Sequence, residues 1–275
     1  MYKKIILAVF TVIFAGIAKG QNFGDIYQKS IPDAKKINYP YLREADVVWS
    51  KRYFRMVDLR EKVNHPLYYP VETTRDGRKN FINIILEEIK AGKITVYSTL
   101  AGQEGVPTTY QEVESLMGAV PHTETVQVDA TTTRIDTIQG EIHPEDVKEL
   151  LLYEEWYFDK KLSKLDVRII AVCPYYMGVD PELKKALHKS LFWVKFDDIR
   201  DVLAKNEVFS AKNDAQRISF DDLFMQRRFN GFIYGESNVY NDRMVNEYLP
   251  GESALFEAER IKNELFNIEH DLWEY

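Results

Sequence analysis

The sequence predicts an α+β fold in which two similar helix–strand units are followed by a C-terminal helix. Segments 81–97 and 220–234 each carry apolar residues at helical spacing, then a glycine, then an alternating stretch typical of a strand. Segment 253–273 repeats apolar residues at steps of three and four, which indicates a long amphipathic helix. Together these three patterns predict a mixed fold whose last helix docks against another surface.

We expect the chain to divide into six segments. In chain order these are a signal peptide at 1–20, an extended arm at 21–43, a first α+β unit at 44–122, a Thr-rich linker or strand pair at 123–142, a second α+β unit at 143–250, and the final helix at 251–275.

The first 20 residues have the pattern of a secretory signal peptide. Lys3 and Lys4 precede an uncharged apolar run, and Ala18-Lys19-Gly20 offers the small residues that a signal peptidase requires. A permanent anchor helix is the alternative, but the run is short for spanning a bilayer. We therefore expect an exported protein whose mature chain begins near Gln21.

The charge of the chain argues against two classes of partner. The net charge is −7, and loss of the three lysines in the predicted signal peptide would make it −10. An acidic surface disfavours nucleic acid and anionic lipid. We expect no direct membrane insertion, so attachment to a membrane would require a partner protein.

The arm at 21–43 lacks periodicity and contains two prolines, so we expect it to be disordered or docked on a neighbour. Residues 46–61 are predicted to run from strand to helix. His65 to Pro70 should form an extended aromatic loop, and Asp76-Gly77 a turn.

Asn80 to Ala91 is predicted to be a helix with one apolar face, after which Gly92 supplies a left-handed C-terminal cap. Residues 93–98 alternate as a strand. A second helix should begin at Thr109, because Glu112 stands at capping-box spacing from it.

The second unit opens with a predicted helix at 145–154. Pro144 would occupy its first position, carboxylates follow, and apolar residues recur at helical spacing. A charged turn is expected at 159–164. Leu165 to Cys173 is a predicted strand, half exposed at its start and buried at its end, that Pro174 should terminate.

The two units can be aligned as an internal duplication. Trp49-Ser-Lys51 matches Trp193-Val-Lys195, and the other matched pairs are Phe81/Phe220, Ile84/Leu223, Ile85/Phe224, Gly92/Gly231 and Ile94/Ile233. The alternative is coincidence, because the order helix, glycine, strand is common.

The final helix carries a stripe of small and aliphatic residues, namely Ala254, Ala258, Ile261, Leu265, Ile268 and Leu272. Phe256, Phe266 and Trp273 widen its apolar face. A face this wide must be buried against something, either the rest of the same chain or a partner.

Candidate catalytic chemistry is sparse. Asp197, Asp198 and Asp201 could hold Mg²⁺ from one side of a helix, but Arg200 and Lys205 favour a solvated charged face. Cys173 is predicted to be a buried, inert thiol. We expect no catalytic residue, cofactor or metal; the alternative is an exported hydrolase that uses the three carboxylates.

The aromatic content is typical of a protein that works through interfaces. There are 17 Tyr, 15 Phe and 4 Trp, with Arg interleaved as in Gln226-Arg-Arg-Phe229, although an aromatic core would give the same count. The predicted partner-binding residues are Phe266, Trp273, Arg227 and Arg228.

Several long stretches resemble one protein family. They are Glu154-Glu-Trp-Tyr-Phe-Asp-Lys-Lys161, Leu165-Asp-Val-Arg-Ile-Ile-Ala-Val172, Phe192-Trp-Val-Lys-Phe196, Asn213-Asp-Ala-Gln-Arg-Ile-Ser-Phe-Asp-Asp-Leu-Phe224, Ala258-Glu-Arg-Ile-Lys-Asn-Glu-Leu-Phe266 and Glu269-His-Asp-Leu-Trp273. Taken together, these stretches resemble the GldN/PorN family. The resemblance implies a periplasmic component of the type IX secretion and gliding machinery, held at the outer membrane in a hetero-oligomeric ring with the lipoprotein GldK/PorK. The periplasmic part of GldM/PorM is implied as a further partner.

Overall fold

The computed structural model of the protein describes residues 31–101, 104–118, 122–129, 132–138, 142–179, 186–210, 217–240 and 242–273. The predicted signal peptide and the first part of the predicted arm lie outside these residues. None of the helices in the described part of the chain combines the length and the apolar character needed to cross a bilayer.

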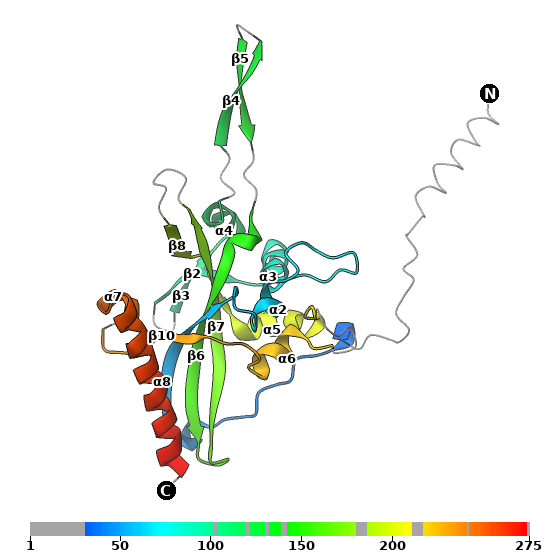
Figure 1. The fold of residues 1–275 in the computed structure, drawn as a ribbon. Coiled ribbons are helices and arrows are strands. Elements are labelled where there is room, and N and C mark those ends of the chain that lie inside the picture. The colour runs from blue at the N-terminus through cyan, green and yellow to red at the C-terminus, as the bar shows by residue number, and fades with distance from the viewer. Residues whose placement is uncertain are drawn as a thin grey trace, which may run out of the picture. The chain divides into compact units, whose positions relative to one another are not determined.

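The described chain is a mixture of strands and helices (Figure 1). The strands are β1 (Val47–Asp58), β2 (Val96–Ala101), β3 (Glu104–Thr108), β4 (His122–Asp129), β5 (Thr132–Ile138), β6 (Val147–Asp159), β7 (Lys164–Val179), β8 (Ala186–Ser190), β9 (Trp193–Lys195) and β10 (Phe232–Glu236). The helices are α2 (His65–Tyr68), α3 (Phe81–Lys90), α4 (Tyr110–Leu116), α5 (Phe196–Lys205), α6 (Phe220–Met225), α7 (Val245–Tyr248) and α8 (Glu252–Trp273), with 3₁₀ turns η1 (Ile31–Asp33), η2 (Glu44–Asp46) and η3 (Pro144–Asp146).

Eight of the strands form one antiparallel sheet. Their order is β10-β1-β6-β7-β9-β2-β3, and β8 pairs with the distal part of β7. The remaining two, β4 and β5, pair only with each other in a separate hairpin. The predicted α+β class is therefore confirmed, and the Thr-rich segment forms a strand pair rather than a plain linker.

The predicted helix at 145–154 is wrong. Only Pro144–Asp146 forms a single 3₁₀ turn, and β6 begins at Val147. Leu150 to Tyr153 are four consecutive buried residues that pair with β1 on one side and β7 on the other. A strand presents successive side chains to opposite faces, so a continuous apolar run can fill two cores at once. Helical spacing at Val147, Leu150 and Leu151 was a by-product of that run.

The predicted strand at 165–173 is confirmed in type and in burial. Leu165 to Arg168 are partly exposed, whereas Ala171 to Pro174 are buried. The expected end at Pro174 is wrong, because β7 continues to Val179. Pro174 stands where the neighbour of β7 changes from β9 to β8, and its carbonyl accepts a hydrogen bond from Leu191 N at 3.0 Å. At this junction between neighbours the missing N–H is tolerated.

The first unit follows its prediction closely in its helices. Asn80 caps α3 by accepting from Asn83 N at 2.8 Å, and Gly92 adopts φ 68° after its end. Thr109 and Glu112 form the predicted capping box of α4. Two expectations fail: β1 remains a strand through Asp58 without a following helix in 46–61, and the expected aromatic loop contains α2. Pro66 lies in the first turn of α2, where proline is tolerated.

The duplication stays a prediction. Both segments contain a helix followed by a strand, α3 with β2 and α6 with β10, but α3 has ten residues and α6 has six. Gly231 does not match Gly92: the left-handed residue after α6 is Arg227, with φ 51°. Gly231 is instead needed for close packing, since a Cβ there would lie 2.6 Å from Met56 O.

Helices α3, α5 and α6 pack together on one face of the sheet (Figure 1). From the sheet, Val57, Leu150, Leu152, Val172 and Val194 contribute to this core; from the helices, Phe81, Ile85, Phe196, Ile199, Phe220 and Phe224. The opposite face of the sheet buries a second cluster that includes Phe54, Met56, Leu151, Tyr153, Cys173 and Trp193.

The C-terminal helix packs on its own chain. Ile261 and Leu265 of α8 are buried against Tyr53 of β1 and Ile233 of β10. The predicted span of this helix, 253–273, is confirmed to within one residue, since α8 runs from Glu252 to Trp273 and begins directly after Gly251, which adopts φ 65°. The alternative that the aliphatic stripe serves only a partner is thus not supported for Ile261 and Leu265.

The described part of the predicted arm is docked on the chain itself. Arg200 donates to Ile37 O at 2.6 Å, and Arg168 donates to Pro40 O at 2.8 Å. Both guanidinium groups also contact the ring of Tyr39, at 4.4 Å from its centre for Arg200 and 4.8 Å for Arg168. The contacts found are with the arm's own chain, so docking on a neighbour stays a prediction.

The burial of α8 predicts a sharp difference between two adjacent residues. Leu265→Ala should lower the free energy of unfolding by about 2–5 kcal/mol, because it removes buried methyl groups and leaves a cavity. Phe266→Ala should change it by no more than about 0.5 kcal/mol, since that side chain is exposed. Urea denaturation measures both, and equal losses would contradict the packing described for α8.

Candidate functional site

Two of the three carboxylates considered as a metal site pair with the arm instead. The ammonium of Lys36 lies 3.5 Å from Asp197 and 3.2 Å from Asp201, while Asp198 is exposed. Among the residues that the structure describes, no group of three His, Cys, Asp or Glu side chains is arranged to hold a metal ion. The local chemistry is that of ion pairing between the arm and α5.

Arg200 was expected on a solvated face, and this is wrong. Its side chain is buried and donates to both carboxylate oxygens of Asp221, at 2.8 and 3.1 Å. Asp221 is itself buried in the first turn of α6, where Ser219 and Asp222 form a capping box. The sequence does indicate that Arg200 is buried, because Arg200 shares a helical face with apolar residues such as Leu203 and Ala204.

Cys173 is fully buried, and this burial raises the pKa of its thiol well above the ordinary value. Since the thiolate is the reactive form, such a group is a poor nucleophile at neutral pH. The prediction of a buried thiol is confirmed.

Arg227, a predicted partner-binding residue, belongs to an internal network around Glu154. The Glu154 side chain is completely buried. It accepts hydrogen bonds from Arg55 at 3.1 Å, from Arg227 at 2.8 Å and from the Trp156 indole at 3.0 Å. The Arg227 guanidinium also lies 5.4 Å from the Trp156 ring. The network therefore joins β1, β6 and the end of α6, and it accounts for Arg227 within the fold.

Arg227 also ends α6 in a specific way. Its left-handed backbone allows the N–H groups of Arg227 and Arg228 to bond Phe224 O and Leu223 O, at 3.0 and 2.9 Å. These are the two hydrogen bonds of a Schellman cap, which glycine usually provides. The cap directs Arg228 outward, and its side chain is exposed.

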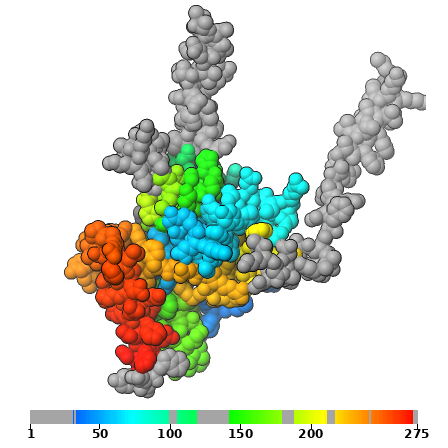
Figure 2. Space-filling model, viewed as in Figure 1, coloured from blue at the N-terminus to red at the C-terminus, as the bar shows by residue number. Residues whose placement is uncertain are grey.

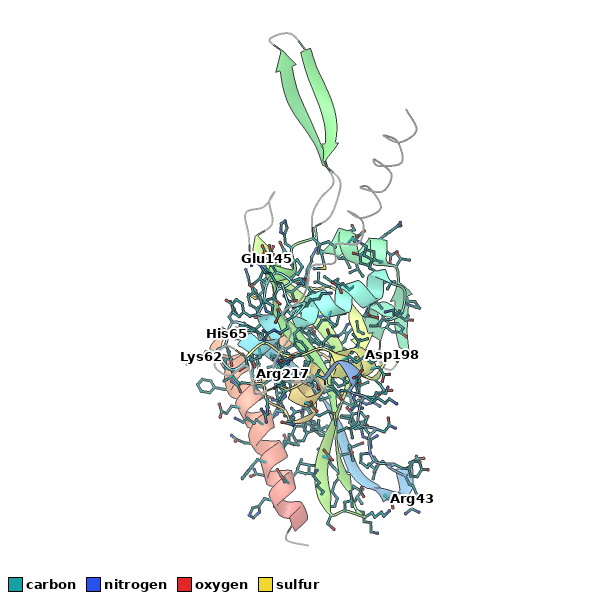
Figure 3. All side chains as sticks on the ribbon, turned by 90° about the vertical axis from the view of Figure 1, so that its right-hand side faces the viewer. Arg43, Lys62, His65, Glu145, Asp198 and Arg217 are labelled. Carbon is teal, nitrogen blue, oxygen red and sulfur yellow. The ribbon has the colours of Figure 1, made fainter. Side chains whose placement is uncertain are left out.

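Arg228 lines a cavity of about 450 Å³ next to α2. The apolar walls of this cavity are formed by Pro66, Tyr69, Val208, Phe209, Ile218 and Leu223. Lys62 and His65 also line it, and Figure 3 shows these two labelled residues side by side, well away from Asp198. A hollow of this size, mostly apolar with a few polar groups, is typical of a binding site.

The cavity is cationic as well as apolar. None of the described residues that line it is acidic. Lys62 and Arg228 have no ion-pair partner among the described residues, and His65 Nε2 lies 3.1 Å from Arg60 O. The cavity thus presents two available cations beside an apolar surface.

The outer surface of α8 is the second candidate site. Phe266 is 66% exposed, and Leu255 and Phe256 are 60% and 68% exposed. Figure 2 shows α8, in red, as a ridge on the surface of the molecule. Trp273 is the last residue of α8, and its side chain is outside the described part. Large exposed apolar residues grouped on one helix mark an interaction surface.

Sequence patterns located only part of these surfaces. Phe266 and Arg228 were singled out as partner-binding residues and both are exposed, but whether they bind a partner stays a prediction. The cavity was missed because its walls come from three separate segments, so no local pattern could indicate it. Phe256 and Phe266 were both expected to widen the apolar face of α8, whereas both are exposed on its outer side.

The Glu154 network predicts a large loss of stability when its carboxylate is removed. Glu154→Ala would leave Arg55 partly buried without its counter-charge, and should cost about 3–5 kcal/mol in the free energy of unfolding. The matched control is Glu155→Ala, whose side chain is 35% exposed and 4.0 Å from Arg52, with an expected cost of about 0–1 kcal/mol. Urea denaturation of both variants measures the difference, and similar costs would show that the network is not stabilising.

Comparison with known proteins places most of the chain in a single family. The family model described as "Gliding motility associated protein GldN" matches residues 42–274. Among curated proteins no match is found. The matched range includes β1, the whole of the large sheet and α8.

Proposed function

The chain belongs to the GldN family of gliding-motility-associated proteins, and from this premise we propose that it is a non-catalytic structural component of the type IX secretion and gliding machinery. The observation that carries the proposal is the match over residues 42–274, which spans both candidate surfaces. The protein acts by assembly, and its exposed apolar residues on α8 and the cavity beside α2 provide surfaces for it.

The proposed location is the periplasm. The support is the pattern of residues 1–20, in which two lysines, an apolar run and small residues follow in the order of a secretory signal peptide. Attachment to the outer membrane comes through a partner, because an acidic chain has little affinity for anionic lipid.

The proposed partners are the lipoprotein GldK/PorK, with which the protein forms a hetero-oligomeric ring, and the periplasmic part of GldM/PorM. Phe266 supports this proposal, because 66% of its side chain is exposed next to a helix face that is already packed on the sheet. A helix with one face in its own core and aromatic residues on another can serve both the fold and an interface.

The test is recovery of the partner from envelopes. Phe266→Ala with Trp273→Ala should leave the melting temperature of the isolated protein unchanged and reduce co-purification of the lipoprotein from detergent-solubilised envelopes. The control is Lys160→Ala with Lys161→Ala, at the exposed turn after β6, which should alter neither quantity. A double variant that melts much earlier than the parent would mean that the aromatic pair belongs to the core.

Replacement of the carboxylates separates assembly from catalysis. Asp197, Asp198 and Asp201, changed together to alanine, should leave secretion, gliding and complex formation intact, because these side chains are exposed and pair only with Lys36 and Arg200 among the described residues. Secretion and gliding assays with pull-down measure the outcome. A variant that assembles normally yet loses secretion would favour the exported hydrolase.

A further inference from the structure

The cavity beside α2 has a chemistry that calls for an acidic and apolar partner. Lys62 and Arg228 are exposed and unpaired with any described residue, and they flank walls made of residues such as Phe209 and Ile218. The chain as a whole carries a net charge of −7, whereas the described lining of this hollow has two available cations and no acidic residue. Complementary charge would orient a partner here, and an apolar side chain would fill the hollow.

The outer side of α8 has the complementary chemistry. Glu252, Leu255, Phe256, Glu259 and Phe266 fall within about 100° of the helix circumference at 3.6 residues per turn. All five are exposed. Glu252 stands four residues before Phe256 and Glu259 three residues after it, so the ring lies between two carboxylates, one turn away on either side.

The two carboxylates are available for a partner. Glu257 and Glu264 of α8 are held by Arg260, at 2.7 and 2.9 Å, but neither Glu252 nor Glu259 pairs with a described residue. We call the set Glu252, Leu255, Phe256, Glu259 and Phe266 the outer stripe of α8. No residue of α8 lines the cavity, so the stripe of a given chain is not seated in its own cavity.

We infer that the outer stripe of one copy docks into the cavity of a second copy, with Phe256 entering the hollow while Lys62 and Arg228 meet Glu252 and Glu259. The inference rests on the proposed function as an assembly component and names one of its contacts. The cavity, about 450 Å³, lies within the range of roughly 300–1,000 Å³ that binding pockets span.

The contact has a direction. The cavity is built from α2, α6 and the segment around Val208, whereas the stripe belongs to α8, so the two copies contribute different surfaces. Such a heterologous contact leaves one free cavity and one free stripe on every pair, and repetition produces a closed ring or an open filament.

The test uses the purified protein in sedimentation-velocity ultracentrifugation at low salt. The parent should form larger species as its concentration rises. A cavity variant, Lys62→Glu with Arg228→Glu, and a stripe variant, Glu252→Gln with Phe256→Ala and Glu259→Gln, should each weaken association roughly tenfold or more, and the neutral stripe gives the mutated cavity no opposite charge to meet. Mixed together, the original stripe of the cavity variant faces the original cavity of the stripe variant, so the mixture should stop at a one-to-one dimer.

The matched control is Lys160→Glu with Lys161→Glu, which changes the net charge by the same amount as the cavity variant at an exposed turn. It should associate like the parent. A parent that stays monomeric at every concentration, or a mixture that stays monomeric, overturns the inference. Loss of the lipoprotein from pull-downs with the cavity variant while self-association persists also overturns it, because the occupant would then be the lipoprotein.

The proposed function is tested separately. If both variants retain the lipoprotein in pull-downs but neither affects self-association, only the inferred contact fails. If the parent itself recovers no lipoprotein, the proposed function fails, whatever the ultracentrifuge shows.

Discussion

Burial of the central β6–β7 hairpin on both faces is the constraint on which the rest of the fold depends. Leu150 and Leu152 point to the helices, while Leu151 and Tyr153 point to the opposite cluster. Because both faces must be apolar, the run cannot tolerate a charge unless that charge is fully compensated. Glu154 directly follows the run, and Arg55, Arg227 and Trp156 supply the compensation. The buried carboxylate of Glu154 also holds the end of α6 in position, since its partner Arg227 forms the cap of that helix.

The contrast between Phe81 and Leu150 shows what sequence patterns could and could not predict. Around Phe81, one helix face is apolar and the other is polar, so periodicity identified α3 correctly, and the glycine at its end was predicted with it. Around Leu150, burial on two faces erases the alternation that marks a strand, and the remaining spacing resembles a helix. The local sequence does not distinguish the helix around Phe81 from the strand around Leu150. The pairing of β6 with β1 and β7 is what distinguishes them.

The two candidate surfaces also differ in how far local sequence patterns can predict them. An exposed residue on a long helix, such as Phe266, can be found from its offset relative to the buried stripe of Ile261 and Leu265. A cavity assembled from α2, Val208 and α6 cannot be found in this way, because its lining combines residues 62–69 with residues 208–228, and more than 130 positions of the chain separate these two parts. Arg200 is an intermediate case. Its spacing from the apolar residues of α5 indicates a buried position, but no local pattern indicates its partner Asp221.

The docking of the arm has a consequence for how its sequence can change. Arg200 and Arg168 bind the carbonyl oxygens of Ile37 and Pro40, and these atoms are the same whichever side chain the position carries. Tyr39 is different, because its ring contacts both guanidinium groups. The arm is therefore recognised by the path of its backbone, by the ring of Tyr39 and by the ammonium of Lys36, which pairs with Asp197 and Asp201. Ile37 and Pro40 can therefore be substituted without loss of these contacts as long as Lys36, Tyr39 and the extended course of the chain are kept.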